Sequence, residues 1–308
     1  MADINSQIKI GQPIRCSLGD PGSRAKTLNR SKDSSWIALL LCAFFFLADG
    51  PPAIAALEPP YDEKLGELIQ KLIVRGLPEE PLSEIFSDSR VTLYPAIVGR
   101  AGKGLDYLGR RFGLLTRTSV KHGKIVMAAN RERLRKIEAA YGVEREVLVA
   151  ILRIETNFGR STGSYPLVNS LLTLALIENR RSSWAEEELI QLLLMCRRQN
   201  RDPLSLKGSW AGAFGFPQFI PSSYLKYGVD GNEDGTVDLY NLTDAFASIA
   251  NYLKSFGWSE HDPEKKRQAV WAYNHCDNYV KAVFAYARAI KTIRKRPGKD
   301  GRFRQPVG

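Results

Sequence analysis

Residues 147–159 read VLVAILRIETNFG. Leu148, Ile151, Leu152 and Glu155 fall at i, i+3, i+4 and i+7, so the stretch predicts a helix with a carboxylate on its apolar face. Gly159 is expected to cap this helix, which puts Glu155 in its last turn. Apolar surroundings and the negative end of the helix dipole both disfavour the charged carboxylate, so we expect a raised pKa.

Two interpretations of Glu155 follow. A carboxylic acid that stays partly protonated near neutral pH suits a general acid that cleaves glycosidic bonds. The alternative is a structural carboxylate at a helix end, paired with Arg153 or Arg160, because ion pairs also perturb the pKa of a carboxyl group.

A second informative block follows at residues 208–224, which read GSWAGAFGFPQFIPSSY. Glycines let a ligand approach the backbone closely, and the interleaved aromatic rings offer flat apolar surfaces that suit sugars. Ser209, Gln218, Ser222 and Ser223 add neutral hydrogen-bonding groups. The composition fits an N-acetylated glycan, and it equally fits a packed turn that buries its aromatic rings.

These two stretches resemble the lytic murein transglycosylase B family, together with residues 180–181 (Arg-Arg), 272–274 (Ala-Tyr-Asn) and 278–279 (Asn-Tyr). The resemblance runs from about Tyr61 to about Ile290. It implies a mainly α fold, in which a lysozyme-like catalytic domain of the SLT type carries an N-terminal helical extension. The implied activity is cleavage of the β-1,4 bond between N-acetylmuramic acid and N-acetylglucosamine in peptidoglycan, with a 1,6-anhydromuramoyl product.

The resemblance also implies residue roles. Glu155 would be the sole acid and base, where ordinary glycosidases use two carboxylates. No cofactor is expected for the chemistry. The residues expected to bind substrate are Ser209, Gln218, Phe219, Tyr273, Asn274, Arg180 and Arg181. A hydrolytic muramidase that uses the same Glu155 and a non-catalytic peptidoglycan-binding protein remain open as alternatives.

Residues 230–238 read DGNEDGTVD and match the start of an EF-hand loop, with oxygen ligands at positions 1, 3, 5 and 9 and glycine at position 6. Position 12 is Asn241, so the usual bidentate Glu is missing. By the resemblance, the loop runs to residue 244 and is a candidate for a structural Ca²⁺. The expected ligands are Asp230, Asn232, Asp234, Thr236 and Asp244. The alternative is a solvated acidic turn, because Asp, Asn and Gly dominate turns.

The chain has a net charge of +11. It shows no recognised nucleic-acid motif, and the charge suits an acidic cell-wall polymer, so peptidoglycan strands are the expected partner. Residues 294–308 form a basic segment that we expect to be disordered, either without a partner or in contact with the envelope or a membrane surface. We expect a monomer.

Residues 36–47 form an unbroken apolar run, preceded by basic residues and followed by Ala53-Ile54-Ala55. The run is shorter than the roughly 20 residues that a spanning helix needs, so it predicts a cleaved signal peptide and export to the periplasm or cell envelope. An uncleaved anchor is the alternative. Export would permit a disulfide between Cys196 and Cys276, which we expect to be buried structural residues.

The expected organisation has four parts. Residues 1–55 are an N-terminal extension with the signal peptide, 56–128 a helical N-terminal part, 129–293 the lysozyme-like domain with the loop at 230–244, and 294–308 the tail. Helices are expected over 61–75, 129–141, 173–177, 186–198, 242–256 and 268–293, the last interrupted near Asn274 and His275.

Overall fold

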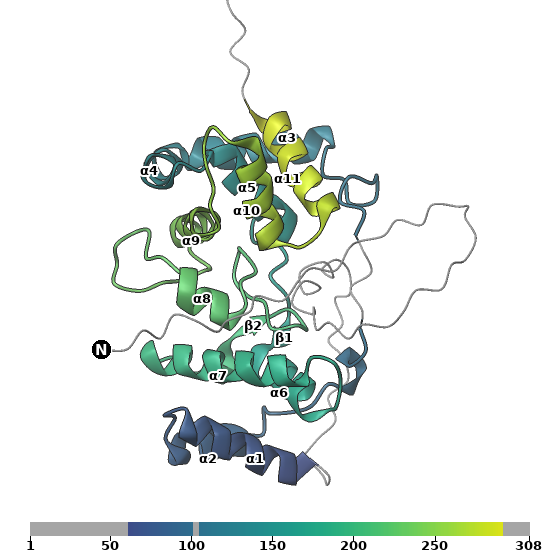
Figure 1. Cartoon of the computed structure of the whole chain (residues 1–308), viewed down its shortest axis with the longest axis vertical. Helices are drawn as coiled ribbons and strands as arrows, with labels where there is room; N and C mark the ends of the chain where they lie inside the picture. The colour runs from purple at the N-terminus through teal and green to yellow at the C-terminus, as the bar shows by residue number, and fades with distance from the viewer. Residues whose placement is uncertain (1–60, 101–104, 292–308) are drawn as a thin grey trace, which may run out of the picture.

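Helices dominate the computed structural model, which describes residues 61–100 and 105–291 (Figure 1). The predicted mainly α fold is confirmed. In chain order the helices are α1 (Tyr61–Val74), α2 (Glu79–Ser87), α3 (Arg117–Ala129), α4 (Arg131–Tyr141), α5 (Arg145–Thr156), α6 (Leu167–Leu176), α7 (Ser182–Arg198), α8 (Pro221–Tyr227), α9 (Leu242–Ser255), α10 (Pro263–Tyr273) and α11 (Asp277–Ile290). Short 3₁₀ turns, η2 and η3, lie at Pro95–Ile97 and Pro203–Ser205.

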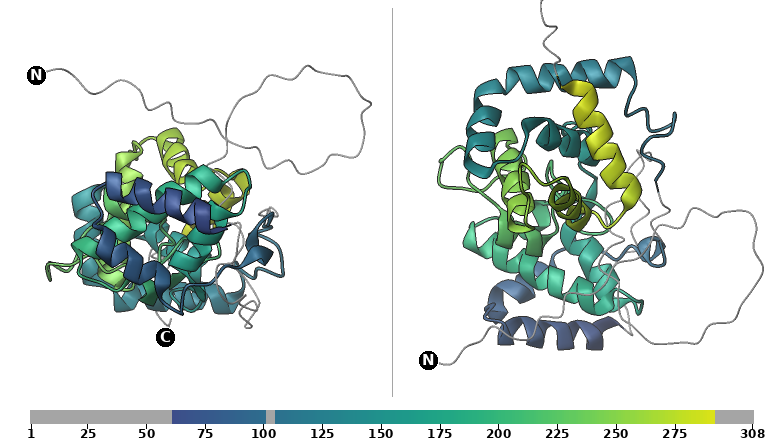
Figure 2. Two further views of the ribbon diagram at one scale, coloured as in Figure 1. Left: turned by 90° about the horizontal axis from the view of Figure 1, so that it is seen from below. Right: turned by 45° about the horizontal axis from the view of Figure 1, so that its top comes forward.

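The helices form two groups stacked along the long axis of the molecule (Figure 1 and Figure 2). In the first group α5 packs against α3, α4, α9 and α11, and α10 lies on α9 and α11. In the second group α6 packs against α7, and α1 and α2 cover the far end. The contact of α8 with both α7 and α9 links the groups.

The central position of α5 explains its sequence. Every residue from Glu146 to Thr156 is buried, because helices surround α5 on several sides. A helix that is buried all round reads as apolar along its whole length, which is what Val147 to Leu152 show. The C-terminal turn of α5, with Glu155, contacts the glycine-rich block, because the Thr156 hydroxyl donates to the Phe216 carbonyl.

The only sheet among the described residues has two short strands and connects the segment after α5 to the glycine-rich block. β1 (Tyr165–Pro166) pairs antiparallel with β2 (Lys207–Gly208), in the register Tyr165 to Gly208. A Cβ atom on Gly163 would lie 2.1 Å from the carbonyl oxygen of Gly208, so only glycine permits this approach. The pairing brings the segment that follows α5 against the glycine-rich block.

Most predicted helices are present, with shifted ends. α4 ends before Gly142, which has a φ of 66°, and α9 ends before Gly257. The expected interruption at Asn274 separates α10 from α11. The prediction for the end of α5 is wrong, because Asn157, not Gly159, is the first left-handed residue. Asparagine tolerates this conformation through local hydrogen bonding. The prediction missed α2, α3 and α8.

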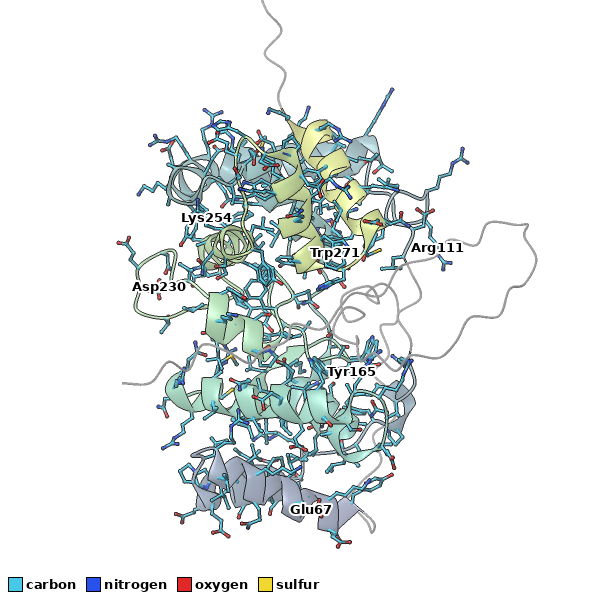
Figure 3. All side chains as sticks on the ribbon, viewed as in Figure 1. Glu67, Arg111, Tyr165, Asp230, Lys254 and Trp271 are labelled. Atoms are coloured by element: carbon cyan, nitrogen blue, oxygen red, sulfur yellow. The ribbon has the colours of Figure 1, made fainter. Side chains whose placement is uncertain are left out.

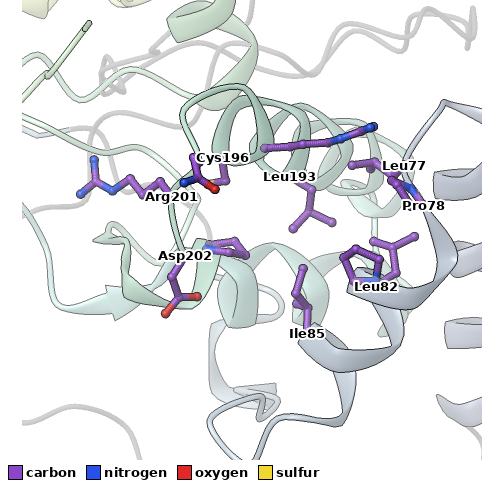
Figure 4. A pocket seen from close by; sticks show the side chains of 12 residues that line it. Leu77, Pro78, Leu82, Ile85, Leu193, Cys196, Arg201 and Asp202 are labelled. Carbon is purple, nitrogen blue, oxygen red and sulfur yellow. The ribbon is translucent and has the colours of Figure 1, made fainter.

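Cys196 and Cys276 are buried, as expected, and both are free thiols, so no disulfide joins them. Cys196 lies at the wall of a cavity of about 350 Å³ between α2 and the end of α7, with Leu77, Leu82 and Ile85 opposite (Figure 4). Burial raises the pKa of the Cys196 thiol to about 12. Both cysteines therefore behave as packing residues.

The signal peptide, the segment before it and the basic tail lie outside the described residues. Within 61–100 and 105–291, no helix is long and apolar enough to cross a membrane. The division of the chain at residues 128 and 129 stays a prediction; that boundary falls at the end of α3, which packs on α5 and α11.

Candidate active site

Glu155 lies in the last turn of α5 with only 4% of its surface exposed. Its Oε1 accepts a hydrogen bond from the hydroxyl of Tyr279 on α11 at 2.5 Å. Burial raises the pKa of the Glu155 carboxyl to about 8, and the hydrogen bond from Tyr279 opposes part of that shift. The carboxyl is therefore mostly protonated at neutral pH and is held by a neutral phenol.

An ion pair with Arg153 or Arg160 is not found among the described residues. Arg153 points to another side of α5, where its Nε donates to the Ser119 hydroxyl at 2.9 Å. Its guanidinium lies over the ring of Phe112, 5.6 Å from the centroid. Arg160 is exposed. Neither arginine therefore pairs with Glu155, and that part of the structural interpretation is wrong.

Tyrosines enclose the carboxyl group. The rings of Tyr273 and Tyr279 are parallel within 6°, with centroids 6.3 Å apart, and Tyr107 meets Tyr279 edge-on at 5.5 Å. The Tyr273 hydroxyl donates to the carbonyl of Pro217 at 2.6 Å. Sequence reasoning assigned no role to Tyr279 or Tyr107; the Asn278-Tyr279 pair in the family resemblance was the only available signal.

The backbone after α5 is fixed by an unusual turn. Asn157, Phe158 and Gly159 all have positive φ, at 50°, 61° and 82°. The Thr156 hydroxyl donates to the Phe216 carbonyl at 3.0 Å and accepts from the Gly159 N–H at 3.0 Å. A Cβ on Gly159 would lie 2.5 Å from Cε1 of Phe216. The turn thus pins the glycine-rich block beside Glu155, and strain of this kind is typical of functional sites.

The glycine-rich block buries most of its aromatic rings. Trp210, Phe214 and Phe219 are each 3% exposed, while Phe216 is half-buried. The packed-turn interpretation therefore holds for the first three rings, because they pack against the core and present little surface to a sugar. Phe219, expected to bind substrate, contacts Tyr252 and Tyr273 at 5.7 and 5.9 Å and supports the site from behind.

Ser209 and Gln218 are also buried and hold the block in shape. The Ser209 hydroxyl accepts from the N–H groups of Ala211 and Ala213, at 3.2 and 2.9 Å. Nε2 of Gln218 donates to the carbonyls of Gly215 and Thr162, at 2.9 and 3.2 Å. Both side chains therefore order the loop.

The structure brings part of the predicted site together. Contacts run from Glu155 to Tyr279, to Tyr273 and then to Pro217, next to Gln218. Asn274 follows directly after Tyr273, at the C-cap of α10, and is buried. These residues come from α5, the block and both ends of the α10–α11 connection.

The two arginines lie on the other helix group, near the start of α7. The Arg181 guanidinium sits 5.0 Å from the centroid of the Trp210 ring, and its Nη2 donates to the Arg100 carbonyl at 2.9 Å. Burial and the neighbouring charge of Arg180 lower the pKa of Arg181. Arg180 itself is exposed. Arg181 thus contacts the ring of Trp210, which directly follows Ser209 in the glycine-rich block.

The acidic loop projects between α8 and α9, with Asp230 at its start (Figure 3). Asp244 is fully buried, and its oxygens accept the N–H groups of Gly231, Asn232 and Asp238 at 2.8–3.3 Å. Asp230 accepts from the N–H groups of Asp234 and Gly235, and Thr236 donates to Asp234. Across the described residues, no three His, Cys, Asp or Glu side chains converge as a metal site.

Comparison with known proteins agrees with this geometry. A family model described as the transglycosylase SLT domain matches residues 103–268, more than half of the chain. The chain belongs to this family.

Individual relatives extend the comparison. The membrane-bound lytic murein transglycosylase B of Escherichia coli strain K12 is 39% identical over 162 residues, 53% of this chain and 45% of that protein. The chain thus spans about half the length of this relative. The soluble lytic transglycosylase SltB1 of Pseudomonas aeruginosa has a TM-score of 0.69 and 27% identity, over 74% of this chain and 98% of that one. Escherichia coli lytic transglycosylase Slt35, solved in complex with calcium, has a TM-score of 0.66 and 26% identity, over 75% and 92%. The predicted lysozyme-like helical fold is confirmed by these similarities.

Proposed function

We propose that this member of the SLT family is a peptidoglycan lytic transglycosylase in which Glu155 serves as both acid and base. The observation that carries the proposal is the buried Glu155 carboxyl, held by Tyr279 with a pKa of about 8. A carboxylic acid that is protonated at neutral pH can donate its proton to a leaving glycosidic oxygen.

The mechanism uses one carboxylate twice. Glu155 protonates the oxygen that links N-acetylmuramic acid to N-acetylglucosamine, and the bond from that oxygen to the anomeric carbon breaks. The substrate's own N-acetyl group stabilises the positive charge on the anomeric carbon. The Glu155 carboxylate then takes the proton from the muramoyl 6-hydroxyl, whose oxygen attacks the anomeric carbon. Glu155 is reprotonated, no water is consumed, and the product carries a 1,6-anhydro ring.

The surroundings of Glu155 support a single-carboxylate route. Two-carboxylate glycosidases place their groups about 5–9.5 Å apart, so that each influences the ionisation of the other. The pKa of Glu155 is instead set by burial and by the Tyr279 hydroxyl. Tyr279 also fixes which carboxyl oxygen is engaged, which leaves Oε2 for the proton that is transferred.

Mass spectrometry of the soluble fragments that the chain releases from purified peptidoglycan tests the proposal. Anhydromuramoyl ends are expected, and Glu155→Gln should release none. Reducing ends would assign a hydrolytic muramidase and overturn the transglycosylase. Binding to the wall without release would overturn the enzyme assignment altogether. The substrate-contact roles expected for seven residues belong to this proposal: Ser209, Gln218, Phe219, Tyr273, Asn274, Arg180 and Arg181.

We further propose that the loop at 230–244 holds a structural Ca²⁺ through Asp230, Asn232, Asp234, Asp244 and the carbonyl of Thr236. Hard oxygen donors of this kind suit Ca²⁺. Burial raises the pKa of Asp244, and the charge of Asp230 raises it further. A cation would relieve the repulsion between the two carboxylates. Its role would be to stabilise the loop that follows the glycine-rich block, and the chemistry at Glu155 needs no metal.

The site of action follows from the same proposal. A chain that acts on peptidoglycan works in the periplasm or cell envelope, which agrees with the signal peptide that residues 36–55 predict. We propose that it acts there as a monomer, with the basic tail as a contact to the envelope.

A further inference from the structure

Charge is distributed unevenly along the long axis of the molecule. α3 and α4 lie at one end, beside the C-terminus of α11, and α1 and α2 lie at the opposite end (Figure 1). α3 and α4 carry the cations Arg117, Lys121, Lys124, Arg131, Arg133, Arg135 and Lys136 against Glu132 and Glu138. α1 and α2 carry the acids Asp62, Glu63, Glu67, Glu79, Glu80 and Glu84 against Lys64 and Lys71. We call α3, α4, the first turn of α5 and Lys291 the basic end.

A cavity of about 530 Å³ opens at the basic end, between α3, α4, α5 and α11. Its lining holds five cations and one carboxylate: Lys124, Arg131, Arg135, Arg145, Lys291 and Glu146. Glu146 is balanced by Arg145, whose Nε lies 3.6 Å from its Oε1. The cavity therefore carries a clear excess of positive charge.

Three of these cations are not neutralised by the protein. Arg135 pairs with Glu132 at 3.3 Å. The side chains of Lys124, Arg131 and Lys291, in contrast, make no hydrogen bond or ion pair with another residue of the described ranges. Arg131 also opens α4, whose N-cap Asn130 makes no side-chain capping bond, so the free N–H groups of that end add positive potential. Phosphoryl groups are the ligands that such a combination favours.

An exposed apolar side chain accompanies the cations. Ile125 lies next to Lys124 on α3 and is 54% exposed. Large hydrophobic residues with this exposure are few among the described residues, and Ile125 lies within the basic end. Aliphatic side chains among Lys and Arg are typical of surfaces that lie in the membrane interface, where they reach below the headgroups.

We propose that the basic end binds the anionic phospholipid headgroups of a membrane surface, with the cavity taking a lipid phosphate. The same anionic surface repels the acidic end at α1 and α2. The long axis of the molecule therefore lies roughly along the membrane normal, and Glu155 is held away from the lipid headgroups. The surface consists of folded residues and is separate from the tail after Lys291, whose sequence adds six further cations. It does not depend on the proposed glycosidic activity.

Sedimentation with lipid vesicles tests this proposal on the full chain. The protein should sediment with phosphatidylcholine vesicles that contain phosphatidylglycerol, not with phosphatidylcholine alone, and added salt should release it. Lys124→Gln combined with Arg131→Gln should weaken binding by about 25-fold, since each cation near an anionic surface contributes roughly fivefold. Both side chains are exposed and unpaired, so folding should be unchanged.

Two matched variants separate this site from general charge effects. Lys207→Gln with Arg198→Gln removes the same charge from exposed positions on β2 and α7, outside the basic end, and should leave binding nearly unchanged. Ile125→Ser should weaken vesicle binding at constant charge. Equal losses in the two double variants, or no binding by the unaltered chain, would overturn the proposal. Release of the protein from vesicles by millimolar inorganic phosphate at constant ionic strength would identify a soluble anion site instead.

Discussion

Tyr279 donates its phenolic proton to Oε1 of Glu155 at 2.5 Å, across 124 residues of sequence. The two side chains meet because α11 packs along α5. Both are buried, so the hydrogen bond acts in a medium of low dielectric and orients the carboxyl group strongly. It also lowers the pKa of Glu155 against the larger effect of burial.

The first prediction concerns this hydrogen bond. Tyr279→Phe removes one oxygen and should reduce kcat roughly 10–100-fold, since a hydrogen bond to a chargeable group contributes about 1.5–3 kcal/mol. The pKa of Glu155 should rise further, so the alkaline limb of the pH profile should move to higher pH. Tyr286→Phe is the matched control: Tyr286 lies two turns later on α11, equally buried, and donates to the Ser119 carbonyl. Equal pH profiles in both variants would contradict a positioning role for Tyr279.

The second prediction links Glu155 to stability. Its folded pKa of about 8 lies above the ordinary value of 4.5, so the folded state holds the proton more tightly than the unfolded state. The free energy of unfolding should therefore fall as pH rises from about 4.5 to 8, by on the order of 3–5 kcal/mol. Glu155→Gln removes this dependence and should be more stable than the unaltered chain at pH 8, with no advantage below pH 4.5.

Urea unfolding at several pH values measures this difference. Glu188 offers the control, because it is also buried, and burial raises its pKa to about 7. Its two oxygens accept the N–H and the hydroxyl of Ser222. A glutamine has one accepting oxygen, so Glu188→Gln should lower the free energy of unfolding below pH 4.5, where Glu155→Gln has little effect. The loss should shrink as pH rises toward 7, because the substitution also removes the raised pKa of Glu188. A Glu155→Gln variant that is less stable at pH 8 would refute the raised pKa.

Local signals explain what the sequence could predict. The spacing of apolar residues over 148–155 and the glycines at 142 and 257 are signals within single helices. They were therefore enough to predict the order of these helices along the chain and the place of Glu155 in the last turn of one of them. The exact cap of α5 did not, because Asn157 and Gly159 can both adopt positive φ. Local composition cannot decide between two residues that satisfy the same conformational requirement.

Tertiary packing explains what the sequence could not predict. The role of Tyr279 depends on how α11 crosses α5, which no spacing within either helix specifies. The aromatic rings of residues 210–219 have the same composition whether they stack on sugars or fill a core, and the burial of Trp210 and Phe219 was settled by the surrounding helices.

The third prediction concerns the turn after α5. Gly159→Ala should cost roughly 2–4 kcal/mol, from the left-handed conformation and from the collision of Cβ with Phe216. Gly142→Ala is the matched control, because Gly142 also has positive φ but a Cβ there would meet no heavy atom within 4 Å, and it should cost only about 1 kcal/mol. Thermal unfolding compares the two. Equal costs would show that the contact with Phe216 contributes nothing to stability.

The last prediction tests the acidic loop. Saturating Ca²⁺ should raise Tm by roughly 5–10 °C, which corresponds to a site filled to about 100 times its Kd. Asp230→Asn with Asp234→Asn should abolish that rise, while Glu233→Gln, an exposed neighbour in the same loop, should keep it. Asp244→Asn should lower Tm even without Ca²⁺, because Asp244 already accepts three backbone N–H groups. If Ca²⁺ does not change the Tm of the unaltered chain, the metal site is rejected. Asp244 would then serve only to hold the loop through its hydrogen bonds to backbone N–H groups.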